Sequence, residues 1–203
     1  MQLLNLEQGS DAWFDFRKGK ISGTHLAALY SKRGTRKLGF YETIAERLAI
    51  EPDDENRMER GLRLEDEAAQ LFAQKYGKKP EVVGVCVSDE NPAIINSPDR
   101  LIKNRGKYTE ALEIKCLSPA RHIQAVVENK VPDEYEAQKI QYFIVNPELQ
   151  KLYFVFYDPR IQSVPFFVVE VTRKELGDLP EKYKQFQIEQ LKEMDDIVTR
   201  LAF

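Results

Sequence analysis

The chain has 203 residues, of which 42% are hydrophobic, and its 30 basic and 33 acidic residues give a formal net charge of −3. It is long enough to bury a sizeable core, and no Ser/Gly-rich linker divides it, so we expect a single domain over residues 1–203. The acidic balance excludes a protein that coats nucleic acid through a broad basic surface, because neutralising phosphates needs clustered Lys and Arg. An enzyme with a locally basic channel is not excluded.

The cysteines and apolar runs exclude further classes. Two cysteines, Cys86 and Cys116, are too few for a disulfide scaffold or a four-cysteine iron–sulfur cluster, and no Cys-x-x-Cys pair indicates zinc. The N-terminal residues lack a basic stretch followed by an apolar one, and the longest strongly apolar run, Leu152 to Tyr157, is too short to cross a bilayer. We therefore expect a cytoplasmic protein without membrane association.

The first predicted elements are two short helices. One lies within residues 5–20, and Ser22 is a suitable N-cap for the next. A helix N-terminus with free N–H groups, the hydroxyls of Ser22 and Thr24 and the nearby Arg17 would form a cradle for a phosphate group. The alternative is an ordinary capped helix beside a surface arginine.

Two longer helices follow, over Phe40–Ile50 and about Arg57–Tyr76. In the second, apolar residues recur at steps of three and four, and Glu65 falls on that apolar stripe. A carboxylate on an inward face is costly unless it is paired, hydrogen-bonded or near a metal ion, so Glu65 is a candidate site residue. The alternatives are a glutamate that reaches water or one that pairs with Arg60 or Arg63.

Three strands are predicted next, as a meander over Glu81–Val87, Ala93–Asn96 and Thr109–Leu117. Pro98 lies between the second and third strands and fixes the backbone just before Asp99. This arrangement delivers a carboxylate at a strand end, where it can meet a side chain of the neighbouring strand.

The third strand alternates apolar and charged residues from Leu112 to Cys116. This period of two puts Glu113 and Lys115 on one face, where they would converge with Asp99. Two carboxylates and the backbone carbonyl of Ile114 suit Mg²⁺, a hard ion that takes oxygen ligands and keeps several waters. Lys115 would orient the attacking water or stabilise charge on a phosphate. The pattern predicts a metal-dependent nuclease site; the alternative is a solvent-facing strand with a charge pair.

A helix is predicted from Asp133 to Asn146, with Asp133 and Glu136 as a capping box. Gln138 and Gln141, three residues apart, project together beside its apolar face. There they can reach the metal site or a phosphate group. The alternative is a solvated polar edge.

Two further strands, Lys151–Tyr157 and Val164–Val171, precede a capping box at Thr172 and Glu175 and a terminal helix after Pro180. The resulting order of elements, αβββαβ, resembles the α/β core of restriction-endonuclease-like nucleases. We therefore expect a central mixed sheet flanked by helices.

Six short motifs occur in order, from residue 7 to about residue 160: Glu7-Gln8-Gly9-Ser10-Asp11-Ala12-Trp13 with Arg17-x-Gly19, Gly61-x-x-x-Glu65, Ser97-Pro98-Asp99, Leu112-Glu113-Ile114-Lys115-Cys116, Ala137-Gln138 to Gln141-Tyr142, and Tyr157-Asp158-Pro159-Arg160. Together they resemble the phage lambda exonuclease, or YqaJ-type viral recombinase, family. Several motifs in register are much harder to obtain by chance than one. The chain departs from the family pattern at Arg100, where the family commonly has glycine, and in a longer gap between Asp99 and Glu113.

The resemblance implies a Mg²⁺-dependent exonuclease, in which Mn²⁺ substitutes, that degrades the 5′-ended strand of linear duplex DNA. It further implies a ring-shaped homotrimer that works with a single-strand annealing protein in recombination. By the same resemblance, Asp99, Glu113 and the Ile114 carbonyl are metal ligands and Lys115 is the catalytic lysine. Other residues receive supporting roles: Asp89 at the metal site, Glu65 with Gln138 or Gln141 in catalysis, and Arg17, Thr24 and Ser97 in phosphate binding. Two alternatives are an endonuclease or junction resolvase on the same fold, and a non-catalytic DNA-binding module.

Overall fold

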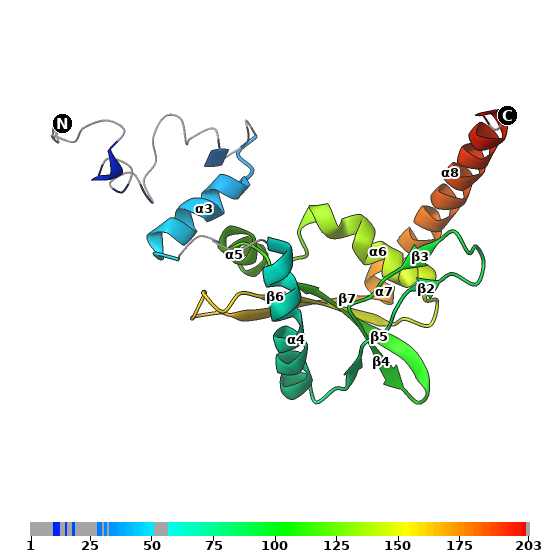
Figure 1. Cartoon of the computed structure of the whole chain (residues 1–203), viewed down its shortest axis with the longest axis horizontal. Helices are drawn as coiled ribbons and strands as arrows, with labels where there is room; N and C mark the ends of the chain where they lie inside the picture. The colour runs from blue at the N-terminus through cyan, green and yellow to red at the C-terminus, as the bar shows by residue number, and fades with distance from the viewer. Residues whose placement is uncertain are drawn as a thin grey trace.

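The computed structural model describes residues 10–12, 15, 18, 28–29, 31, 33–50 and 57–201. Five strands of this part form one mixed sheet in the order β1–β4–β5–β6–β7 (Figure 1). Their bounds are Pro80–Glu81, Arg100–Asn104, Lys107–Lys115, Lys151–Tyr157 and Phe166–Thr172. β5 and β6 run parallel, and every other neighbouring pair is antiparallel. The expected α/β fold with a central mixed sheet is confirmed.

Alternate residues of the central strands point into two separate cores. On one face, Leu112 and Ile114 of β5 pack against Leu64, Ala68 and Phe72 of helix α4 (Arg57–Tyr76). On the other face, strand residues pack against helix α6 (Glu136–Val145), whose Tyr142 and Phe143 are buried. Because both faces are covered, residues 111–114 of β5 are buried on both sides of the sheet. We had predicted a half-buried strand here.

Helix α5 (Pro119–Glu128) was not predicted. It begins with Pro119 at its first turn and ends at Asn129, whose φ of 49° and ψ of 42° are left-handed. Both are ordinary start and stop signals. With α6 and a short 3₁₀ turn, η1 (Asp133–Tyr135), α5 makes the long crossover that a parallel β5–β6 pair requires. It also packs against helix α3 (Leu38–Arg47), which we predicted.

The predicted three-stranded meander is wrong. The residues expected in its first strand are divided between β1 and β2 (Cys86–Val87), and β2 pairs with β3 (Ile95–Asn96) in a separate two-stranded sheet. The antiparallel partner of β5 is β4, whose residues Arg100–Asn104 lie between the second and third predicted strands. β4 holds only two buried apolar side chains, Leu101 and Ile102, so its periodic signal is too short to recognise.

The two predicted capping boxes have different outcomes. The Thr172 hydroxyl accepts from the backbone N of Glu175, and the backbone N of Thr172 donates to the Glu175 carboxylate. These two bonds confirm the box at the start of the short helix α7 (Arg173–Leu176). The box at Asp133 is wrong, because η1 occupies those residues and α6 has no side-chain cap.

The terminal helix is α8 (Leu179–Leu201). Ile188 and Leu191 in its first half pack against α6. The second half extends away from the sheet (Figure 1), and Met194, Val198 and Leu201 are exposed there. In the described part of the chain, no helix is long and apolar enough to span a membrane.

A buried ion-pair cluster connects α4 to the ends of β5 and β6. Asp158 is fully buried; its Oδ1 accepts from Arg60 Nη2 at 3.0 Å and from Arg160 Nε at 2.8 Å. Arg60 Nη1 also donates to the carbonyls of Cys116 at 3.2 Å and Leu117 at 3.1 Å, directly after β5. The cluster therefore holds the start of α4 beside the C-terminal end of β5.

We expect Asp158→Asn to lower the free energy of unfolding by about 3 kcal/mol, because two arginines lose the buried carboxylate that they share. Glu148→Gln is a matched control that removes the exposed partner of Lys107, and it should change stability by less than about 1 kcal/mol. Urea denaturation measures both. Equal losses in the two variants would contradict a structural role for the Asp158 cluster.

Candidate active site

Two carboxylates meet where β4 and β5 pair. Asp99 stands immediately before β4, and Arg100, the first residue of β4, lies opposite Leu112 of β5. The Asp99 carboxylate reaches the neighbouring strand, where its Oδ2 accepts from the Ile114 backbone N at 2.6 Å. Glu113, on the same strand, is 2% exposed. The structure thus brings Asp99 and the Glu113–Lys115 segment together, as predicted.

Three side chains hold the Glu113 carboxylate. Its Oε1 accepts from Lys115 Nζ and from Gln138 Nε2, each at 2.6 Å, and its Oε2 accepts from the Tyr142 hydroxyl. The Lys115 ammonium also lies 4.7 Å from the centre of the Tyr135 ring. The orientation of Glu113 is therefore set from both β5 and α6.

Tyr142 is a site residue to which the sequence reasoning gave no role. Its hydroxyl also accepts from the Asp99 backbone N at 3.4 Å, so it contacts both acidic residues. Burial, then the charge of Glu113, raise the pKa of Tyr142 far above its ordinary value, which keeps the hydroxyl a donor. Its position one turn after Gln138 was the available signal, because residues four apart share a helix face.

The two predicted glutamines have different contacts. Gln138 reaches Glu113, whereas Gln141 donates to the Ile95 carbonyl at 2.9 Å and accepts from Gln187 of α8 at 2.8 Å. The contacts of Gln141 join α6 to β3 and α8. The sequence left open which glutamine serves the site, and Gln138 is the one that contacts Glu113.

Glu65 lies at the edge of the site and is bound by an arginine. Arg100 Nη1 donates to Glu65 Oε1 at 2.6 Å, and Arg100 Nη2 donates to Asp66 Oδ1 at 2.5 Å. The sequence suggested Arg60 or Arg63 as the partner of Glu65, since both are near it along the helix. The structure pairs Glu65 with Arg100, the first residue of β4, whose side chain extends from the sheet to α4.

The remaining predicted residues are two exposed residues and three that the structure does not describe. Asp89 is exposed in the turn between β2 and β3, and among the described residues no hydrogen bond or ion pair joins it to Asp99 or Glu113. Ser97 is exposed, two residues before Asp99. The other phosphate-binding candidates lie outside the described residues: Arg17, Ser22 and Thr24.

The donor set of the cluster fits a hard cation. Burial, then the charge of Glu113, raise the pKa of Asp99 to about 7, while the hydrogen bond from Ile114 acts in the opposite direction. The half-buried Asp99 and the buried Glu113 are therefore unfavourable neighbours without a compensating positive charge. Across residues 33–50 and 57–201, no group of three or more His, Cys, Asp or Glu side chains has a metal-binding arrangement. Mg²⁺ needs fewer, because it uses one or two carboxylates and keeps its waters.

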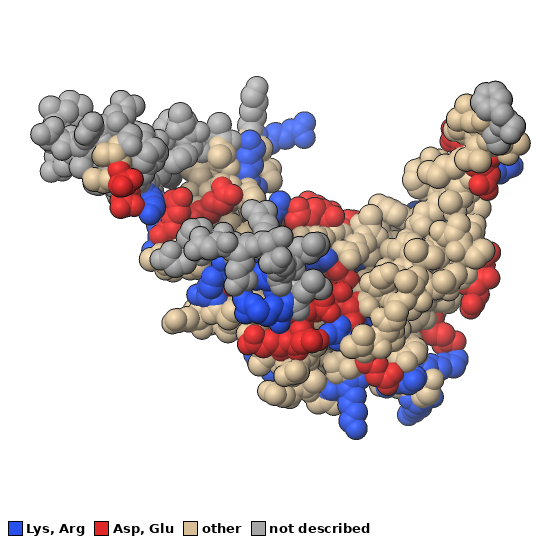
Figure 2. Space-filling view, in the orientation of Figure 1, with Lys and Arg blue, Asp and Glu red and all other residues tan. Residues whose placement is uncertain are grey.

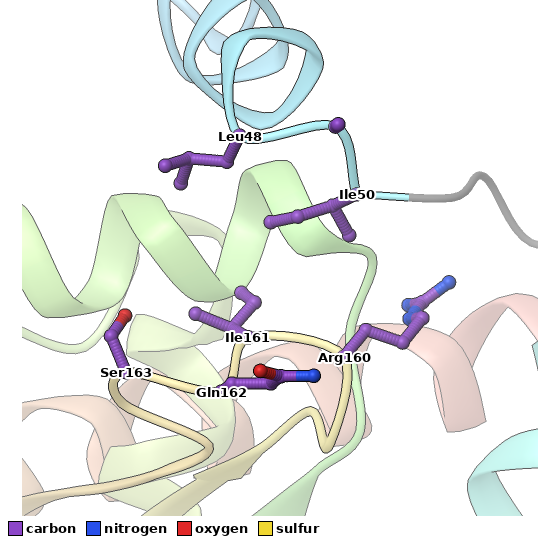
Figure 3. A pocket seen from close by; sticks show the side chains of 7 residues that line it. Leu48, Ile50, Arg160, Ile161, Gln162 and Ser163 are labelled. Atoms are coloured by element: carbon purple, nitrogen blue, oxygen red, sulfur yellow. The ribbon is translucent and has the colours of Figure 1, made fainter.

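The charged surface and a pocket outside the cluster complete the description of the site's surroundings. Figure 2 shows acidic and basic side chains interspersed over the visible face. A pocket of about 420 Å³ lies between the end of α3 and the loop after β6, lined by residues that include Ile50, Arg160 and Ser163 (Figure 3). It contains none of the cluster residues.

The chain is similar to a known domain family and to solved structures. A model of the YqaJ-like viral recombinase domain matches residues 12–146. The crystal structure of LHK-Exo in complex with dAMP is 25% identical, with a TM-score of 0.61, and the match covers 95% of this chain and 98% of that one. A second structure, of the alkaline exonuclease LHK-Exo from Laribacter hongkongensis, is 24% identical with the same TM-score and coverage. Curated protein sequences gave no match.

We expect Tyr142→Phe to lower the free energy of unfolding by about 1–3 kcal/mol, because buried groups of Glu113 and Asp99 lose a hydrogen-bond partner. Tyr183→Phe, at an exposed position near the start of α8, is the matched control and should change stability by less than about 0.5 kcal/mol. Urea denaturation of both variants compares the two hydroxyls. A neutral Tyr142→Phe would show that its hydroxyl does not support the carboxylates.

Proposed function

The chain belongs to the family of YqaJ-like viral recombinase domains, and we propose that it is a Mg²⁺-dependent 5′-to-3′ exonuclease that digests one strand of linear duplex DNA. The family and the alkaline exonuclease structures support a nuclease, a hydrolase acting on DNA, with a role in recombination, and nucleases of this type depend on a metal ion. The observation that carries the proposal is the meeting of two acidic residues and a lysine at one end of β5, where Asp99 binds the backbone N of Ile114 and Lys115 binds Glu113.

The roles of the residues follow from these contacts. Asp99, Glu113 and the Ile114 carbonyl would hold Mg²⁺, or Mn²⁺ in its place, which when bound supplies Lewis-acid polarisation of the scissile phosphate. The Lys115 ammonium, only 17% exposed, stabilises charge that develops on the phosphate oxygens and orients the attacking water. Low exposure strengthens this interaction, because less water screens the charge.

Supporting residues keep the cluster in one geometry. Gln138 donates to the same Glu113 oxygen as Lys115, and the Tyr142 hydroxyl donates to the other. Donors that are already in place need no reorganisation during the reaction. Glu65, which Arg100 binds at the edge of the site, and Asp89 in the turn between β2 and β3 are proposed to assist the site without being ligands of the ion.

Further parts of the proposal concern the assembly. We propose a single nuclease domain over residues 1–203 that acts in the cytoplasm as a homotrimer and passes its 3′ single strand to a single-strand annealing protein. The exposed apolar residues in the second half of α8 support an interface, because such a stripe on a projecting helix favours burial against a partner.

We expect Lys115→Ala and Glu113→Gln each to lower the Mg²⁺-dependent digestion rate on linear duplex DNA by roughly 100-fold or more. Lys107→Ala is the matched control, because Lys107 is an exposed residue of the same strand. Release of nucleotides is measured with excess Mg²⁺ and again with a chelator, and circular dichroism checks folding.

The same assay separates the alternatives. Cleavage of covalently closed circular DNA would identify an endonuclease, and a preference for branched DNA would identify a junction resolvase. A folded Lys115→Ala protein with the wild-type rate would contradict the assignment of the site.

We also propose that Arg17, with Ser22, Thr24 and Ser97, binds the terminal 5′-phosphate. The support is chemical: a planar guanidinium makes paired hydrogen bonds to phosphate oxygens, and a helix N-terminus adds N–H donors. Ser97 stands two residues before Asp99 and is exposed, so its hydroxyl is accessible to a phosphate that approaches the site.

We expect the wild-type protein to prefer 5′-phosphorylated over 5′-hydroxyl duplex ends by about ten- to a hundredfold, because a charged hydrogen bond contributes roughly 1.5–3 kcal/mol. Arg17→Ala should abolish this preference. Lys18→Ala, which removes an adjacent exposed cation, should retain it. Initial rates on matched duplexes with the two kinds of end measure this preference. An unchanged preference in Arg17→Ala would contradict a role for Arg17 in phosphate binding.

A further inference from the structure

Arg100 is a buried cation next to the carboxylate cluster. Its side chain is 8% exposed, although it follows the exposed turn that carries Ser97. Few arginines are buried this deeply without acidic partners, because taking a guanidinium out of water is costly. Its contacts should therefore explain why it is there.

The Arg100 guanidinium joins three groups from two elements. Nη1 donates to Glu65 Oε1 and to the backbone carbonyl of Asp99, both at 2.6 Å. Nη2 donates to Asp66 Oδ1 at 2.5 Å. One cation thus ties the middle of α4 to the residue that begins the site.

The two acidic partners are unequal. The Asp66 side chain is 78% exposed, whereas that of Glu65 is 27% exposed. Glu65 also shares Arg100 Nη1 with the Asp99 backbone carbonyl, which places it next to the residue that begins the site. Of the two, Glu65 is therefore the one that matters electrostatically to the cluster, and Arg100 neutralises it.

This arrangement limits what Glu65 can do. One oxygen of Glu65 is taken by Arg100, and a carboxylate already paired with a guanidinium is a poorer ligand for a divalent cation. The acidic groups near the cluster are Asp99, Glu113 and Glu65, and the cations that face them are Lys115 and Arg100. Arg100 therefore neutralises this third carboxylate from within the protein. Without Arg100, the Glu65 carboxylate would attract a cation from solution.

We propose that Arg100 is a positioning residue that withholds Glu65 from the cation site, so that Asp99 and Glu113 alone supply its carboxylate ligands. The inference rests on the proposed cation site of the nuclease. It adds the residue that sets the affinity of this site for a divalent cation. In the absence of Arg100, Glu65 is released toward Asp99, and the site binds a divalent cation more tightly.

The experiment measures Mn²⁺ binding to the full chain without DNA, by the electron paramagnetic resonance signal of free Mn²⁺. Arg100→Gln should tighten Mn²⁺ binding by about tenfold, since an additional carboxylate replaces a repelling cation; a tenfold change corresponds to about 1.4 kcal/mol. Arg100→Lys retains the charge and should stay within about threefold of wild type. Combining Arg100→Gln with Glu65→Gln should cancel the gain, which shows that it acts through Glu65.

A second variant tests the proposal without changing Arg100. Glu65→Gln alone should change Mn²⁺ affinity by less than about threefold, because Glu65 is not a ligand while Arg100 binds it. A loss of tenfold or more would make Glu65 a ligand and overturn the proposal, as would wild-type or weaker affinity in a folded Arg100→Gln protein. Asp66→Asn is the matched control, since it removes only the exposed partner of Arg100 and should leave affinity unchanged.

Failure of the proposed function gives a different result. If Mn²⁺ binding by the wild-type chain survives Glu113→Gln unchanged, the cation is not bound at this cluster, and both the site and the role of Arg100 are wrong. If Glu113→Gln abolishes binding and the Arg100 variants have no effect, only the role of Arg100 is overturned.

Discussion

The buried carboxylate of Glu113 and the half-buried carboxylate of Asp99 lie close together where β4 pairs with β5, and the surrounding residues compensate for that arrangement. The Ile114 N–H binds one carboxylate, and Lys115, Gln138 and Tyr142 bind the other. Like charges held together in a region of low dielectric repel each other, so such a pair persists only with donors and cations around it. The sheet places the pair, and the helices on its two faces bring the compensating groups.

The two helices contribute in different ways. α6 lies on the face that carries Glu113, so residues one turn apart on it, Gln138 and Tyr142, reach the same carboxylate. α4 covers the opposite face and contributes acidic residues at the edge of the sheet, where Arg100 binds them. The buried Asp158 cluster holds the start of α4 against the end of β5. Displacement of either helix would therefore alter the electrostatics of the site and not only its packing.

Much of the fold was accessible from local patterns. α4 and β6 have the bounds that their periodicity indicated, and the box at Thr172 and Glu175 is present. Short elements escaped, because two-residue strands and the five-residue β4 carry too few apolar residues for a period to be visible. The box at Asp133 failed for another reason: Pro132 and the next three residues form a 3₁₀ turn before α6 begins.

For the candidate site, the sequence by itself determined that Asp99 stands at a strand end and that Glu113 and Lys115 share a face, because proline chemistry and the two-residue repeat of a strand are local properties. Only the tertiary structure decided which distant groups complete the cluster. Gln138 was separated from Gln141, Tyr142 was added, and Arg100 became the partner of Glu65 through the pairing of β4 with β5 beside α4. These contacts join residues 25 to 46 positions apart in the chain, and no local pattern encodes such distances.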